Sequence, residues 1–308
     1  MSILFFEAIA RHALWGNTLV KNYFGYHEMP DGTGQTWAFS ADEKGSNICQ
    51  NDPYKGLTLK QIWQDHQELF EREGESFPVI ISLVGPEDNL SVQIHPDTPR
   101  AQKLGFPFGK NEAWYFLDCI PDAKIVYGHN ASSKEEFLRM AKEDQWDKLL
   151  RHLPVKNGDF VYTPSGTVHG VGRGCVTYEI QQATDVTYRL YDYHRKDVNG
   201  KERKLDFDEG IDCITSYPQK YEPVSAPVTS SCEGGVRTQF ISNDSFTVTR
   251  VTVDGTYHFQ DDNYQLATVV AGTGAVDGIT ISIGDSFLIP VREEAVFEGK
   301  LTVMMTRK

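Results

Sequence analysis

Short runs of apolar or alternating side chains dominate this sequence. They occupy residues 77–84, 113–117, 159–162 and 176–180, and they fill most of the chain from residue 246 to the end. Glycine, proline, asparagine and aspartate bound these runs. Because strands of sandwiches and barrels have this length and these boundaries, the pattern predicts a mainly β protein.

Two segments have helical periodicity instead. The segment 57–72, LTLKQIWQDHQELFER, starts with a capping-box pattern between Thr58 and Gln61. The segment 132–153, SSKEEFLRMAKEDQWDKLLRHL, starts with two serines suited to capping and stops before Pro154. We therefore expect a few helices to be added to the strands.

A faint repeat divides the chain. GDFVYTP at residues 158–164 is echoed by GDSFLIP at 284–290, and the first copy leads to His169 whereas the second has Ala295 in that place. The proline-containing stretch 217–227 resembles a linker. We expect two related β units: a catalytic domain over 1–215, and a degenerate second domain over 216–308 without metal ligands.

Three short motifs suggest a metal site. In LSVQIHP, residues 90–96, Gln93 and His95 share one face of a strand that Pro96 ends. Glu112 opens an aromatic strand, where burial of its charge needs a cation. GDFVYTPSGTVHGVG has the spacing of the second cupin motif and presents His169. Imidazole, carboxylate and amide groups suit an N/O metal site. The alternative to a metal site is that the histidines are structural and that the glutamate is exposed to solvent or paired with a lysine.

Three further residues suit the chemistry of an anionic substrate. Lys110 lies two residues before Glu112, so both side chains point to one side of an extended chain. Asp185 and Arg189 follow a strand, and an arginine fork suits a phosphate or a developing enediolate oxygen. The alternative for Arg189 is a structural pair with Asp185 or Asp192.

Composition narrows the class of protein. The 308 residues carry a formal net charge of −13, which argues against nucleic acid or an anionic membrane as a partner. The five cysteines lack a CxxC spacing, as expected of reduced thiols in a cytoplasm. No leader or membrane-spanning run is visible in the sequence. We expect a cytoplasmic protein.

Taken together, the motifs closely resemble type I mannose-6-phosphate isomerase of the short bacterial form, a member of the cupin superfamily, over nearly the whole chain. The resemblance rests on Gln93-x-His95-Pro96, Lys110-x-Glu112, Pro164-x-Gly166-x-x-His169 and Glu179…Asp185…Arg189. It implies a jelly-roll fold and one Zn²⁺ per chain. It also implies a phosphorylated hexose as substrate, with mannose 6-phosphate and fructose 6-phosphate interconverted through a cis-enediolate.

The resemblance also implies roles for individual residues. The zinc ligands of the family fall on His95, Glu112 and His169. Its glutamine falls on Gln93, which would be a fourth ligand or would orient the others, and its active-site arginine falls on Arg189. The chemistry also needs a proton carrier, for which Lys110 and Asp185 are the candidates.

Two departures from the family keep other functions open. Ser82 lies where the family often has lysine, and Gln35 where it often has glutamate. Lower efficiency or a different phosphorylated sugar would follow from a lost phosphate contact. The alternatives are a non-catalytic sugar-binding or regulatory cupin and a different metal-dependent cupin, such as an iron-dependent oxygenase.

Overall fold

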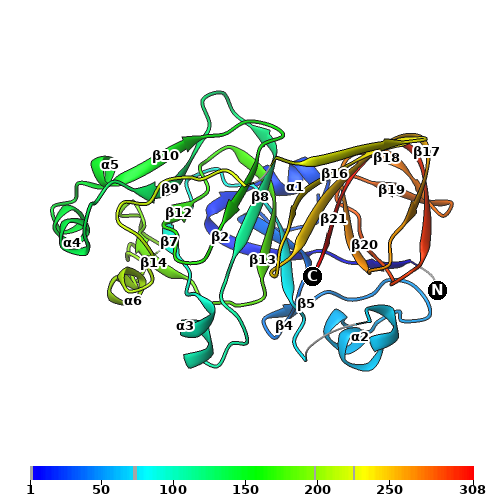
Figure 1. The fold of residues 1–308 in the computed structure, drawn as a ribbon, viewed down its shortest axis with the longest axis horizontal. Coiled ribbons are helices and arrows are strands. Elements are labelled where there is room, and N and C mark those ends of the chain that lie inside the picture. Colours follow the sequence, from blue (N-terminus) through cyan, green and yellow to red (C-terminus); the bar gives the residue numbers. More distant parts are fainter. Residues whose placement is uncertain (1–2, 72–74, 198, 225) are drawn as a thin grey trace.

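The protein is mainly β, as the sequence predicts, in a computed structural model that describes residues 3–71, 75–197, 199–224 and 226–308 (Figure 1). Two sheets form the larger unit. The six-stranded sheet has the order β11 (Phe160–Thr163), β8 (Glu112–Cys119), β13 (Cys175–Gln182), β6 (Val79–Val84), β3 (Thr33–Phe39), β2 (Ile9–Asn17). The five-stranded sheet has the order β10 (Leu150–Pro154), β9 (Lys124–His129), β12 (His169–Gly170), β7 (Val92–Ile94), β14 (Tyr188–Tyr191).

The C-terminal unit is built on one larger antiparallel sheet, on the right of Figure 1. Its order is β1 (Leu4–Phe6), β20 (Ser286–Ile289), β18 (Gln265–Val276), β21 (Glu294–Arg307), β17 (Thr247–Gln260), β16 (Gly235–Ser242), β15 (Val228–Cys232), with β19 (Ile279–Ser282) paired to β18. A small hairpin of β4 (Ala41–Asp42) and β5 (Gly45–Ser46) stands apart. An apolar cluster fills the interior of this unit.

Side-chain alternation along the strands separates the cores. In β7, Val92 and Ile94 pack with the helices on the outer face of the five-stranded sheet, which leaves Gln93 on the other face. In β13, Tyr178 and Ile180 pack toward the C-terminal unit, which leaves Glu179 on the other face. The inner faces of the two sheets therefore carry the polar residues, beside an apolar cluster that both sheets share.

The helices are α1 (Leu19–Phe24), α2 (Leu59–Asp65), the 3₁₀ turn η1 (Gln67–Leu69), α3 (Thr98–Lys103), α4 (Lys134–Lys142), α5 (Trp146–Leu149) and α6 (Phe207–Ile211). The capping box predicted between Thr58 and Gln61 is confirmed. The segment expected as a helix over 57–72 breaks after Asp65, and residue 72 lies outside the described residues.

The single helix expected over residues 132–153 is wrong. The chain turns at Asp144, whose φ of 55° is left-handed, so α4 ends there and the short α5 follows. Residues from Leu150 onward form β10 instead, paired with β9. Strand pairing and burial of Leu149 and Leu150 outweigh the local helical pattern.

The repeat seen in the sequence has a structural counterpart. Gly158 and Gly284 both adopt positive φ, and the aspartate after each accepts a backbone N–H from three residues before it. The strands β11 and β20 follow these two turns. At the place that corresponds to His169, Ala295 is buried in the apolar interior of the C-terminal unit.

The two units share one continuous core. Phe246 and Met304 of the C-terminal unit lie in the same buried cluster as Tyr178 and Tyr115 of the six-stranded sheet. The Tyr178 and Thr306 hydroxyls are 3.1 Å apart and hydrogen-bonded. The N-terminal strand β1 pairs with β20, so the chain starts in the C-terminal sheet (Figure 1). The division at residue 215 stays a prediction.

This shared core predicts cooperative unfolding. Phe246→Ala removes a fully buried ring that contacts Tyr162 across the units, and we expect it to lower the free energy of unfolding by about 3–5 kcal/mol. Chemical denaturation followed by fluorescence and circular dichroism should show one transition. Val228→Ala, at a side chain that is 68% exposed, is the control and should stay within about 0.5 kcal/mol of wild type. Two separate transitions would contradict a shared core.

Candidate metal centre

Three side chains converge between the two sheets of the larger unit. His95 follows β7, Glu112 opens β8 and His169 opens β12. His95 Nε2 lies 3.1 Å from Glu112 Oε1, and His169 Nε2 lies 3.3 Å from Glu112 Oε2. All three residues are buried, and their ligand atoms lie within 4.8 Å of one another. The structure thus brings together the three residues that the sequence predicts.

Backbone carbonyls orient both imidazoles. His95 Nδ1 lies 2.9 Å from the oxygen of Val186, and His169 Nδ1 lies 2.8 Å from that of Thr167. A carbonyl only accepts, so each Nδ1 carries a hydrogen, and Nε2 is the nitrogen that faces Glu112. Burial, followed by the charge of Lys110, lowers the pKa of His95 to about 4. This imidazole is therefore neutral, as a metal ligand must be.

The Glu112 carboxylate is ionised but lacks hydrogen bonds. Burial would raise its pKa, but the charge of Lys110, together with the adjacent His95 imidazole, outweighs burial and holds the pKa well below its usual value. Lys110 Nζ lies 2.9 Å from Oε1, yet neither Glu112 oxygen has a hydrogen-bond partner of acceptable geometry among the described residues. Two imidazoles around a carboxylate without hydrogen-bond partners are a donor set that fits Zn²⁺ in an open site.

Gln93 lies beside this cluster. It is directly opposite His169 in the pairing of β7 with β12, so both side chains share one face of the sheet. The Gln93 amide end is 3.4 Å from His169 Nε2. Its role as a fourth ligand stays a prediction.

A cavity of about 280 Å³ opens next to the metal centre. Five residues singled out in the sequence line it, namely Gln93, Lys110, Glu112, Asp185 and Arg189. They come from both sheets and from the loop before β14. The cavity therefore has a metal-ligating end and several charged side chains in its wall.

Asp185 and Arg189 do not pair with each other. Asp185 forms an ion pair with Lys44; burial would raise its pKa, but the hydrogen bond and charge of Lys44 bring it below its usual value. Arg189 donates to Ser91 Oγ and to the backbone oxygen of Lys204, each at 3.3 Å. The alternative interpretation of Arg189 as a partner of Asp185 or Asp192 is thus wrong.

Glu179 is a functional candidate for which no individual role is predicted from the sequence. Its carboxylate accepts a hydrogen bond of 2.8 Å from Trp114 Nε1 and lines the cavity. Burial, and then the charge of Glu112, raise its pKa to about 7. Ser82, which replaces the family lysine, lies directly opposite Glu179 in the sheet. The signal was present in the alternating run VTYEIQQ, whose polar positions share the inner face.

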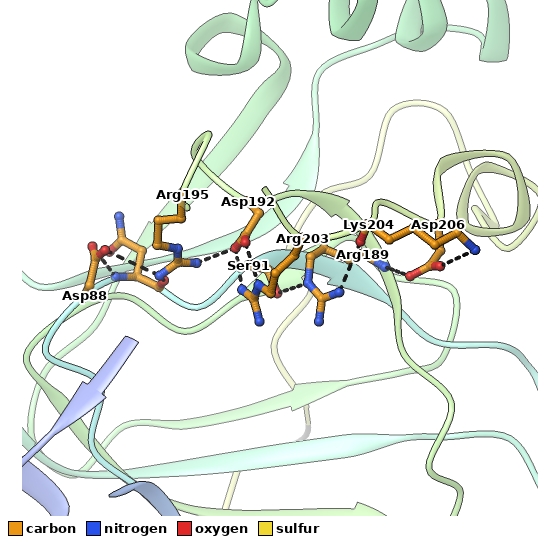
Figure 2. Close-up of polar contacts among 9 residues, drawn as sticks. Asp88, Ser91, Arg189, Asp192, Arg195, Arg203, Lys204 and Asp206 are labelled. Atoms are coloured by element: carbon orange, nitrogen blue, oxygen red, sulfur yellow. Dashed lines mark hydrogen bonds and ion pairs between the residues drawn. The ribbon is translucent and has the colours of Figure 1, made fainter. Parts of the chain in front are cut away.

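Arg203 also lines the cavity. It comes from the loop after β14, and Figure 2 shows its guanidinium group beside that of Arg189. No motif spacing marks this residue, because a loop of unpredictable path brings it to the site.

Among the described residues, no helix is both long enough and apolar enough to cross a membrane.

Comparisons with known proteins agree with this geometry. Residues 4–118 match the family described as phosphomannose isomerase type I, catalytic domain, and residues 236–307 match the mannose-6-phosphate isomerase cupin domain. The mannose-6-phosphate isomerase ManA of Bacillus subtilis is 38% identical over 296 residues, which cover 93% of this chain and 92% of that protein. The mannose-6-phosphate isomerase of Streptococcus mutans is 36% identical and covers 98% and 96%.

Solved structures extend the likeness to the whole fold. The crystal structure of a mannose 6-phosphate isomerase from Bacillus subtilis superposes with a TM-score of 0.95 at 33% identity, over 100% of both chains. A zinc-bound mannose 6-phosphate isomerase has a TM-score of 0.78 at 13% identity, also over 100% of both chains, and shows the same fold. The cupin fold expected from the sequence is thereby confirmed, and the chain belongs to the type I phosphomannose isomerase family.

Proposed function

We propose that this protein interconverts mannose 6-phosphate and fructose 6-phosphate. The observation that carries the proposal is the buried cluster of His95, Glu112 and His169 beside a cavity that is lined by both basic and acidic side chains. Family membership supports it, because relatives of similar length are named as mannose-6-phosphate isomerases. The substrate class would accordingly be a phosphorylated hexose.

The residues present fit one Zn²⁺ per chain. His95 and His169 would bind it through Nε2 and Glu112 through its carboxylate, while Gln93 would be a fourth ligand or would orient His169. When bound, zinc would polarise a sugar oxygen and stabilise the charge that develops during isomerisation. The backbone acceptors of the two Nδ1–H groups would keep the imidazoles in place for that task.

Aldose–ketose isomerisation moves a proton between C1 and C2 through a cis-enediolate, so a proton carrier must face the sugar. Lys110 and Asp185, the candidates from sequence, both line the cavity. Lys110 is engaged with Glu112, and the low pKa of Asp185 makes it a weak base. We assign the proton transfer to Glu179, because its carboxylate lines the cavity beside the candidate metal centre and is held there by the hydrogen bond from Trp114.

A non-catalytic sugar-binding cupin is the second candidate, favoured by Ser82 in place of the family lysine. Ser82 is buried on the inner face opposite Glu179, which lines the cavity, so the change lies next to the cavity wall. A binding protein would be stabilised by the sugar phosphate without converting it, which separates the two candidates directly.

Metal removal tests the zinc mechanism. Purified protein should contain about one zinc per chain by elemental analysis and should convert mannose 6-phosphate in a coupled assay. Chelation should abolish the activity and added zinc should restore it, because the proposed mechanism depends on zinc bound by these residues. An activity that survives both chelation and His95→Ala would rule the mechanism out.

Glu112→Gln keeps the shape of the side chain and removes its charge. We expect zinc content to fall by at least about tenfold. The metal-free variant should also unfold more easily than metal-free wild type, by about 3 kcal/mol, because Lys110 stays buried without its counter-charge. Denaturation in chelator measures this difference. Glu135→Gln on the exposed side of α4 is the matched control, and unchanged zinc content in Glu112→Gln would contradict the assignment.

Glu179→Gln keeps the hydrogen bond from Trp114 but cannot carry a proton. We expect kcat to fall by about 10²–10⁴-fold with zinc content unchanged. Asp185→Asn, measured in the same coupled assay, should lose much less. If Asp185→Asn or Lys110→Met instead shows the larger loss in kcat while Glu179→Gln stays active, the proton carrier is one of those residues.

A further inference from the structure

Two arginines lie side by side in the cavity wall. Arg189 belongs to β14 and Arg203 to the loop that follows, and both line the cavity. Burial, and then the charge of Arg203, lower the pKa of Arg189. Two neighbouring like charges repel each other, and Asp192, which is paired with Arg203, offsets only part of this repulsion. The pair therefore suits a negatively charged ligand.

Hydrogen-bond acceptors of the protein hold the guanidinium groups of Arg189 and Arg203 in place. Arg203 makes a two-pronged contact with Asp192, with Nε 2.6 Å from Oδ2 and Nη2 2.5 Å from Oδ1. Asp192 is only 4% exposed and also accepts from Arg195 Nη2 at 2.6 Å (Figure 2). Arg189 is held through Nε and Nη1 by Ser91 and the carbonyl oxygen of Lys204. Both forks are thus preorganised, so little rotamer entropy is lost on binding a ligand.

Each arginine keeps one terminal nitrogen free. Among the described residues, Arg189 Nη2 and Arg203 Nη1 form no hydrogen bond or ion pair, whereas their other nitrogens are engaged. Figure 2 shows these two nitrogens pointing to the same side, away from Asp192. Two parallel donors of this kind match two oxygens of one phosphate group.

The arginine pair lies at a defined separation from the metal centre. Arg189 is directly opposite Gln93, and Gln93 is directly opposite His169, so these residues form one row across three strands. Two interstrand spacings, about 10 Å, separate the ends of the row at the backbone. A sugar whose carbonyl end lies at the metal centre would extend its far end toward the arginines.

We propose that Arg203, positioned by Asp192, forms with Arg189 a clamp for the phosphate group of the substrate. The proposal rests on the proposed isomerase function and adds to it a specificity-determining residue, Arg203, and a positioning residue, Asp192. The clamp concentrates positive charge in a chain whose formal net charge is −13. It places phosphate recognition on β14 and its following loop, apart from the inner face of the six-stranded sheet, where Ser82 lies.

Arg203→Gln tests the clamp, with Lys201→Gln as the matched control. Both substitutions remove one positive charge from the same loop, and the Lys201 side chain is exposed. We expect Arg203→Gln to raise KM for mannose 6-phosphate by about tenfold to a hundredfold, with kcat changed less than about threefold, because a charged hydrogen bond to the remote phosphate is lost. Arg203→Lys should recover only part of the loss, since lysine lacks the fork.

Inorganic phosphate gives a readout that does not depend on turnover. Its affinity for the zinc-loaded protein, measured by calorimetry, should weaken in Arg203→Gln by a factor similar to the rise in KM and should not change in Lys201→Gln. Asp192→Asn should behave as Arg203→Gln does, raising KM more than it lowers kcat. Circular dichroism and the melting temperature would show that each variant is folded.

The outcomes separate the clamp from the proposed function. If wild type converts no mannose 6-phosphate, the isomerase proposal fails, and phosphate affinity still decides the clamp. If Arg203→Gln leaves both KM and phosphate affinity unchanged, Arg203 is a structural partner of Asp192 and the clamp is wrong. An equal effect in Lys201→Gln, or a loss confined to kcat, would overturn it as well.

Discussion

The larger unit is organised around a buried negative charge. Glu112 lies between the imidazoles of His95 and His169 and the ammonium group of Lys110, where water cannot solvate it. An isolated carboxylate would be neutralised by protonation at such a position, but the charge of Lys110 beside it holds its pKa low. The two sheets must therefore keep their register and spacing, because small displacements would leave the charge uncompensated.

Strand alternation serves stability and chemistry at once. In β8 and β13 one set of side chains builds the core shared with the C-terminal unit, and the alternate set includes Glu112, Glu179 and Gln181, which line the cavity. The C-terminal unit has the same type of Gly-Asp turn but an apolar interior, with Ala295 where the other unit has His169. It contributes packing to the sheet that carries Glu112 and Glu179.

The metal-ligating side chains and the two arginines of the cavity lie on different elements of the fold. The metal-ligating groups lie where β7, β8 and β12 meet, and Glu179 lies on the adjacent inner face of the six-stranded sheet. Arg189 and Arg203 lie on β14 and its loop (Figure 2). Asp192 accepts hydrogen bonds from both Arg203 and Arg195, so it fixes the position of the Arg203 guanidinium at the cavity wall.

The sequence by itself determined the local features that have fixed spacing: the strands, the capping box at Thr58, the cupin turn before His169 and the pair Gln93 and His95 ahead of Pro96. Periodicity and turn chemistry act over a few residues, and the sequence shows them directly. Only the tertiary structure decided three features. The helix expected over 132–153 is interrupted at Asp144, Arg189 forms hydrogen bonds with groups other than Asp185, and the side chain of Arg203 lines the cavity. Strand pairing and the path of loops control these outcomes through contacts between residues distant in the sequence, for which a local pattern has no signal.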